Sequence, residues 1–240
     1  MKYIIKTNHK RYIMEVNEKE YYYFIKIGGK DKDDCIEMFV YKDNNIAKLQ
    51  QVDYDKLCTL DIPLEKGLGT RDMIKTSLYA LKKIFPNVTH VTLEDCSSVV
   101  CDLYNRPSLL YYYIAFIGKS WYEMYMGANP DGDKLEKRYR KIKEQIKNDK
   151  KMDNELFKTK VLYTCDQDDI TFIMDKYNNS NSYQEFFDLL KKDEKLNVCY
   201  KRYTWMERLF IINDMVIPKY WIIDMDLYSC SVFVTIVKMG

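Results

Sequence analysis

Gly67 and Gly69 stand directly before the most regular pattern in the chain, and together with their surroundings they restrict the folds that it can form. Apolar residues recur at intervals of three and four over residues 70–85, which predicts an amphipathic helix that ends before a proline. Lys56–Ile62 before the glycines and Thr89–Glu94 after the helix have the composition of strands. A strand, a glycine loop, a helix and a strand in this order predict two parallel strands joined by a right-handed crossover.

The residues before this unit predict a β meander. Strands rich in Tyr, Ile, Val and Phe are expected at Lys2–Lys6, Arg11–Val16, Tyr21–Ile27 and Cys35–Tyr41. The sequence Gly28-Gly29-Lys30-Asp31 is typical of a turn, so we expect the last two of these strands to form a hairpin.

The second half of the chain predicts an α+β extension. Residues 127–133 contain two glycines and a proline, which is typical of a loop. We therefore expect a boundary there between a domain at 1–128 and an extension at 129–240 that packs on the first domain. Ser97 or Ser98 is expected to cap a helix that runs to Tyr104. Further elements are expected as helices at Lys134–Lys151, Asp169–Tyr177 and Tyr183–Lys192, and as a closing pair of strands at Tyr220–Tyr228 and Ser231–Lys238.

Composition narrows the class of protein. The 38 basic and 36 acidic residues leave a net charge of +2, which argues against a dedicated nucleic-acid binder. No apolar run reaches the roughly 18 residues that span a bilayer, and the first residues lack the apolar stretch of a secretory signal. The seven cysteines are scattered without a C-x-x-C pair, so we expect mostly buried thiols and no metal site. These observations together predict a cytoplasmic protein.

The glycine loop is the segment that best suits a ligand. Glycine permits close approach of a backbone, and the first turn of a helix offers unpaired N–H groups with a partial positive charge. Lys66-Gly67-Leu68-Gly69-Thr70, with Lys66 and Arg71 as cations, therefore suits a phosphate or a pyrophosphate. The spacing is that of neither a P-loop nor a dinucleotide fingerprint, because Asp72 stands at the third glycine position of the latter. An ordinary strand-to-helix turn explains the same residues.

Two segments resemble motifs of the GNAT superfamily of acetyl-CoA-dependent N-acetyltransferases. Leu64–Gly69 is similar to the family's Q/R-x-x-G-x-G/A pyrophosphate loop, with Leu64 at the Gln/Arg position. Ser97–Arg106 is similar to its N-x-x-A-x-x-L-Y-x-K motif and keeps the Leu-Tyr pair and a basic Arg106. The resemblance implies a GNAT-like mixed sheet around the β-α-β core. It also implies acetyl-CoA as cofactor and direct transfer of its acetyl group to an amine acceptor.

The resemblance also implies roles for individual residues. The cofactor pyrophosphate would lie against Lys66, Gly67, Leu68, Gly69, Thr70 and Arg71. Tyr104 would protonate the departing thiolate, and an N–H group near residues 60–62 would stabilise the oxyanion. Glu94 is the first candidate for the base that takes the proton of the amine, followed by Asp95 and Asp61.

Other functions remain open. The first alternative is a catalytically inactive protein of the same fold with a structural or interaction role. The composition is typical of an AT-rich genome such as that of a large DNA virus, so this role would suit a protein associated with the virion. A third hypothesis is a module that binds CoA or a nucleotide but does not transfer an acyl group. A protein partner or a second copy of the chain also remains open. The basic helix at 134–151 suits a nucleic acid or an acidic partner, or a solvated helix that lies on a core. The aromatic residues at 111–125 suit a core and its rim.

Overall fold

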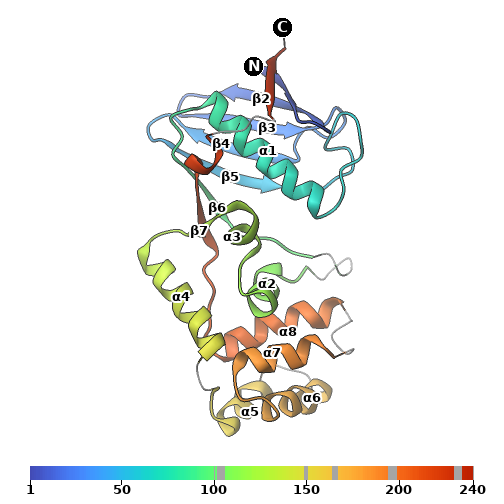
Figure 1. Cartoon of the computed structure of the whole chain (residues 1–240), viewed down its shortest axis with the longest axis vertical. Coiled ribbons are helices and arrows are strands. Elements are labelled where there is room, and N and C mark those ends of the chain that lie inside the picture. Colours follow the sequence, from blue (N-terminus) through green and yellow to red (C-terminus); the bar gives the residue numbers. More distant parts are fainter. Residues whose placement is uncertain are drawn as a thin grey trace. The chain divides into compact units, whose positions relative to one another are not determined.

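The computed structural model describes residues 1–99, 101, 106–148, 151–163, 167–193, 199–229 and 234–239. This part of the chain holds eight α-helices and a nine-stranded mixed sheet, which confirms an α+β protein (Figure 1). It divides into two compact units. The first comprises Met1–Glu94, Tyr125–Asn129 and Tyr220–Gly240, and the second comprises Asp95–Met124 and Pro130–Lys219.

This division differs from the predicted boundary between residues 128 and 129. Residues 95–124 belong with the later helices, and the last twenty or so residues return to the sheet of the first unit. The return follows from strand pairing, because β8 (Tyr220–Asp224) pairs with β6 (His90–Glu94).

The predicted meander is confirmed. Its strands are β1 (Lys2–Lys6), β2 (Arg11–Glu18), β3 (Tyr22–Gly28) and β4 (Ile36–Tyr41), followed by β5 (Ile46–Val52). Each strand pairs antiparallel with the next, so the expected hairpin is that of β3 and β4. The sheet order is β7-β8-β6-β5-β4-β3-β2-β1-β9, where β7 is Asn129–Pro130 and β9 is Thr235–Lys238.

The β-α-β unit is confirmed, but its first strand was placed wrongly. β5 and β6 are parallel, and α1 (Leu68–Ile84) connects them. Residues 56–62 form no strand and belong to the loop before α1, where the Leu60 N–H donates to the Arg11 carbonyl at 2.9 Å. β5 was missed because only two of its residues, Ala47 and Leu49, are buried and alternate with less buried ones. Two glutamines follow them and hide the pattern.

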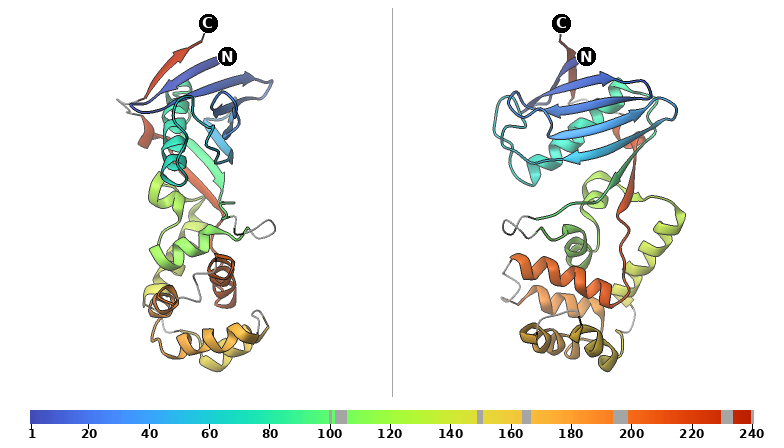
Figure 2. Two further views of the ribbon diagram at one scale, coloured as in Figure 1. Left: turned by 90° about the vertical axis from the view of Figure 1, so that its right-hand side faces the viewer. Right: turned by 180° about the vertical axis from the view of Figure 1, so that it is seen from behind.

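The core of the first unit lies between α1 and one face of the sheet (Figures 1 and 2). Alternate strand residues point into it, as the period of two requires. The fully buried ones include Met14, Ile25, Met38, Val91 and Trp221. α1 contributes Met73, Ile74, Leu78 and Leu81 from one stripe, and Ser77 Oγ donates to the Met73 carbonyl within the helix.

The last two strands do not pair with each other, contrary to expectation. β8 pairs antiparallel with β6, whereas β9 pairs antiparallel with β1 at the other end of the strand order. Residues 225–228, which were expected to continue β8, form a short 3-10 helix, η2, that begins where Asp224 caps it. Each strand has an apolar centre, and this local pattern does not specify a neighbour.

The second unit is helical. Its helices are α2 (Leu109–Ile117), α4 (Asp133–Asn148), α5 (Asn154–Leu162), α6 (Gln167–Asn178), α7 (Tyr183–Lys191) and α8 (Cys199–Ile212), together with α3 (Trp121–Met126), whose last two residues belong to the first unit. The three helices expected here are confirmed as α4, α6 and α7, whereas α5 and α8 were missed. No helix of the described residues has the length and apolarity to cross a membrane.

The core of the second unit is largely aromatic. The rings of Phe157 and Tyr177 stack with centroids 3.6 Å apart, and Phe187 stacks on Phe210 at 5.5 Å. Tyr111, from the predicted aromatic segment, is 4 % exposed and meets Phe210 edge-on. The expectation that this segment builds a core and its rim is therefore confirmed for Tyr111.

A disulfide between Cys35 and Cys58 corrects the expectation of buried thiols at these two positions. The two cysteines are 23 residues apart, and their Cα atoms lie 5.8 Å apart. The bond attaches the loop before α1 to the start of β4. Gly29 permits this contact, because a Cβ atom there would lie 1.9 Å from the Leu57 carbonyl oxygen.

The disulfide predicts a specific pattern of stability losses. Closing a loop of this length contributes about 3 kcal/mol to the free energy of unfolding. Urea denaturation should therefore show that Cys35→Ser, Cys58→Ser and the double variant each lose about 3 kcal/mol, because each removes the same bond. Losses that add in the double variant would indicate two separate thiols, as would alkylation of both cysteines in the unreduced, denatured protein.

Candidate cofactor site at the start of helix α1

α1 begins at an exposed and uncapped turn. Gly67 is its N-cap, with φ 82° and ψ −86°, and its carbonyl accepts the Arg71 N–H at 3.0 Å. No side chain caps the helix, and its first turn holds no acidic residue. The N–H groups of the first turn lack acceptors within the helix, as in any α-helix, so this end can stabilise an anion.

The two glycines also have structural reasons to be there. The positive φ of Gly67 is one that other residues rarely adopt. A Cβ on Gly69 would lie 3.1 Å from the side chain of Leu64, which is 2 % exposed. Leu64 thus packs beneath the first turn, at the position where the GNAT motif has a polar residue. The ordinary strand-to-helix turn therefore accounts for both glycines without a ligand.

The polar groups at this turn differ in their availability. Lys66 is exposed. Arg71 donates to Asp72 Oδ1 through Nε at 2.9 Å and Nη2 at 2.8 Å, and it lies 5.7 Å from the Tyr125 ring centroid. Thr70 Oγ1 is buried without a hydrogen-bond partner. A ligand at this turn would meet Lys66 directly and would compete with Asp72 for Arg71.

The pairing of β5 with β6 ends at the carboxyl end of the two strands, and its last paired residues are Leu49 and Leu93. Beyond them Gln51 and Val52 of β5 pair only with β4, while Glu94 pairs with Tyr220 of β8. A crossover helix starts at the carboxyl end of the strand that precedes it, so the last residues of β5 and the start of α1 share one end of the unit. Such ends are where α/β sheets bind ligands.

One of the groups expected to stabilise the oxyanion near residues 60–62 is engaged elsewhere, and so is the carboxylate of Asp61. The Leu60 N–H already donates to the Arg11 carbonyl. Asp61, the third candidate base, accepts hydrogen bonds from Arg11, which hold the pKa of its carboxyl below the usual range. This pair fixes the loop and keeps Asp61 ionised and engaged.

Glu94 and Asp95 differ in their surroundings, although they are adjacent in the chain. Glu94 ends β6 and is exposed. Asp95 is 3 % exposed, Oδ1 accepts the Ser97 N–H and hydroxyl, and Oδ2 is buried without a partner. Burial raises the pKa of the Asp95 carboxyl, and the hydrogen bonds from Ser97 partly oppose this rise. Burial therefore makes the Asp95 carboxylate a better proton acceptor than an exposed carboxylate, a property that the sequence did not reveal.

The segment that follows departs from the expected capped helix. Ser97 binds Asp95, and Ser98 forms an isolated bridge with Ser108, which itself caps α2. Tyr104 and its neighbours at 102–105 lie outside the described residues, so the role of Tyr104 as general acid stays a prediction.

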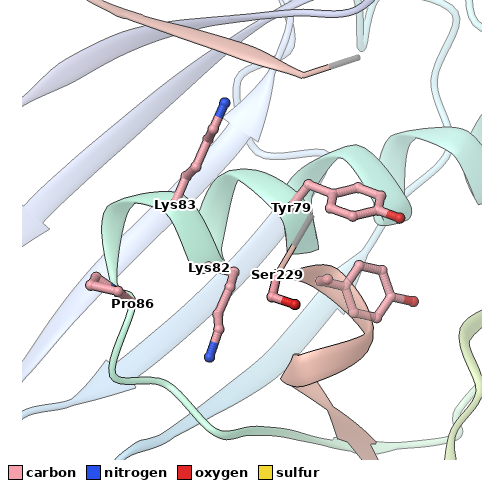
Figure 3. Close-up of a pocket in the computed structure, with 6 residues that line it drawn as sticks. Tyr79, Lys82, Lys83, Pro86 and Ser229 are labelled. Atoms are coloured by element: carbon pink, nitrogen blue, oxygen red, sulfur yellow. The ribbon is translucent and has the colours of Figure 1, made fainter. Parts of the chain in front are cut away.

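A cavity of about 320 Å³ lies at the other end of α1 (Figure 3). Tyr79 and Tyr228 line it with their rings, whose centroids are 5.0 Å apart. Its two lysines are engaged, since Lys82 Nζ donates to the Val88 carbonyl at 2.9 Å and Lys83 Nζ to that of Val234 at 2.7 Å. These lysines bind the last turn of α1 to its surroundings, which is a structural role.

The described residues include no cluster of His, Cys, Asp and Glu that could hold a metal ion. Comparison with models of known protein families, with curated proteins and with solved structures finds no match to this chain.

Asp95 predicts a dependence of stability on pH. In the unfolded chain its carboxyl titrates near 3.8, and its pKa is higher in the folded protein. Its contribution is therefore fully present below pH 3.8 and is lost as the pH rises through the folded-state pKa. Asp95→Asn keeps an acceptor for Ser97 without the buried charge, so we expect it to be more stable than the wild type at pH 7 and to lose this advantage in acid.

The measurement is the free energy of unfolding in urea at several pH values, with Glu94→Gln as the matched exposed control. We expect the control to differ little from the wild type. If Asp95→Asn were less stable than the wild type at pH 7, this result would contradict the claim that the buried Asp95 carboxylate destabilises the folded protein.

Proposed function

We propose that the first unit binds acetyl-CoA, with its pyrophosphate at the start of α1, and that the protein transfers the acetyl group to an amine. The observation that carries the proposal is the parallel β5–β6 pair, whose pairing ends on the side of the sheet where the uncapped α1 starts. Acetyl-CoA has an anionic pyrophosphate, which the helix end suits, and an extended chain, which the edge of β5 beyond Leu49 suits.

The phosphate contacts follow from the geometry of the turn. The first-turn N–H groups and Lys66 would bind the pyrophosphate, and the orphaned Thr70 hydroxyl offers one further donor. Gly67 leaves the turn open, because nothing lies within 4 Å of the position of a Cβ. Arg71 would contribute after exchanging Asp72 for a phosphate oxygen.

The acetyl group would lie further along this edge of β5. β5 beyond Leu49 pairs with no described strand on the side away from β4, so its backbone N–H groups can stabilise the oxyanion of the attacked thioester. The proposed oxyanion contact is therefore at residues 50–52 instead of residues 60–62. Glu94 remains the proposed base for the amine and Tyr104 the proposed acid for the leaving thiolate.

The disulfide favours a second candidate function. Disulfides persist in oxidising surroundings such as virion surfaces and are rare in the reducing cytosol. Cys35–Cys58 therefore supports the alternative of a virion-associated protein with a structural or interaction role. The Asp72 contact of Arg71 and the apolar Leu64 fit this alternative, because both lower the affinity of the turn for phosphate.

Thermal denaturation with acetyl-CoA tests the binding. At a concentration ten times the Kd, binding adds about 1.4 kcal/mol and raises the Tm by roughly 3 °C for a chain of this size. Gly67→Asp should abolish the rise, because it places a carboxylate where the pyrophosphate lies. Gly132→Asp is the matched control, since Gly132 also has a positive φ, of 95°, and open space at the Cβ position.

The two candidate functions differ in the outcome. A rise in Tm that Gly132→Asp keeps and Gly67→Asp loses supports the cofactor site, and release of free CoA thiol in the presence of primary amines supports transfer. No rise at millimolar acetyl-CoA would exclude the enzyme and favour the structural role.

A further inference from the structure

A cavity of about 300 Å³ in the second unit is bordered by cations. It lies among α2, α4 and α7. Ile114 and Ile146, both buried, contribute apolar lining, and the cationic lining residues are Lys119, Arg140, Lys143 and Lys147. Glu144 is the acidic residue in this lining.

The four cations are not equally engaged. Lys143 Nζ binds Glu123 Oε1 at 2.9 Å, and the Arg140 guanidinium binds Glu136. Glu123 also accepts the Tyr139 hydroxyl, so the Lys143 pair belongs to the packing of α4. Lys119 and Lys147 have no carboxylate of the described residues within ion-pair distance, and both are exposed.

The charge of α4 as a whole adds to this local excess. Its sixteen residues carry seven basic and three acidic side chains, and the buried stripe of Tyr139, Ile142 and Ile146 leaves the charges outside the core. An exposed basic face alone is typical of a solvated helix. The cavity distinguishes one part of this face, because an apolar lining beneath the lysines can hold the body of an organic ligand while the cations hold its anionic group.

We propose that this cavity binds a small organic ligand that carries a diphosphate or a longer phosphate chain. Lysine ammonium groups bind phosphate oxygens as point charges, and an arginine guanidinium adds paired hydrogen bonds. Lys119 and Lys147 make the first contacts, and Arg140 joins them by exchanging Glu136 for phosphate. The site lies in the second unit and is independent of the proposed cofactor turn, which lies in the first.

Titration calorimetry with inorganic pyrophosphate tests the site. We expect Lys119→Gln/Lys147→Gln to weaken pyrophosphate binding at least tenfold, which corresponds to about 1.4 kcal/mol. Lys134→Gln/Lys137→Gln is the matched control, because it removes two exposed α4 lysines that do not line the cavity. We expect this control to bind pyrophosphate within twofold of the wild type.

Two results would overturn the proposal. One is a wild-type protein that binds no pyrophosphate at about 10 mM. The other is equal weakening in both variants, together with tighter binding of a single-stranded oligonucleotide, which would assign the basic face of α4 to nucleic acid. Circular dichroism should show that both variants fold, and an unchanged effect of acetyl-CoA on their Tm would separate this site from the first.

Discussion

The parallel pairing of β5 with β6 is the constraint on which the first unit depends. Two adjacent parallel strands need a crossover, and the chain supplies it as α1. The crossover lays the apolar stripe of α1 on the sheet and covers the buried residues of the meander strands. It also brings the start of α1 to the carboxyl end of β5, where the pairing with β6 ends. The core and the candidate site therefore have one common origin.

The loop between β5 and α1 is fixed at several points. Cys58 joins it to Cys35, the Leu60 N–H and Asp61 bind Arg11, and the Tyr54 hydroxyl donates to the Leu64 carbonyl at 3.0 Å. These contacts hold the first turn of α1 in one conformation, and a turn held in this way loses little entropy when an anion binds. The same contacts would also rigidify a loop with a purely structural role, so rigidity alone does not distinguish the two functions.

The sequence predicted those elements whose pattern is local and repeated. α1 and α4 have long apolar stripes, and the meander strands alternate regularly, so both groups were found. β5 was missed because its polar glutamines hide the alternation, and the disulfide was missed because the spacing of cysteines does not reveal which of them meet in space. The neighbours of β8 and β9 depend on pairing over long distances, which one strand cannot specify. Asp95 was ranked below Glu94 because burial, and not residue type, distinguishes them.

The most direct measurement is a two-dimensional NMR titration of protein labelled with ¹⁵N-glycine. The chain has eight glycines, so the spectrum is simple, and Gly67→Ala and Gly69→Ala assign the two signals of the turn. If the start of α1 binds the cofactor, acetyl-CoA should shift the amide signals of Gly67 and Gly69 and leave those of Gly118 and Gly132 unchanged. Unchanged signals from Gly67 and Gly69 at saturating acetyl-CoA would contradict the account.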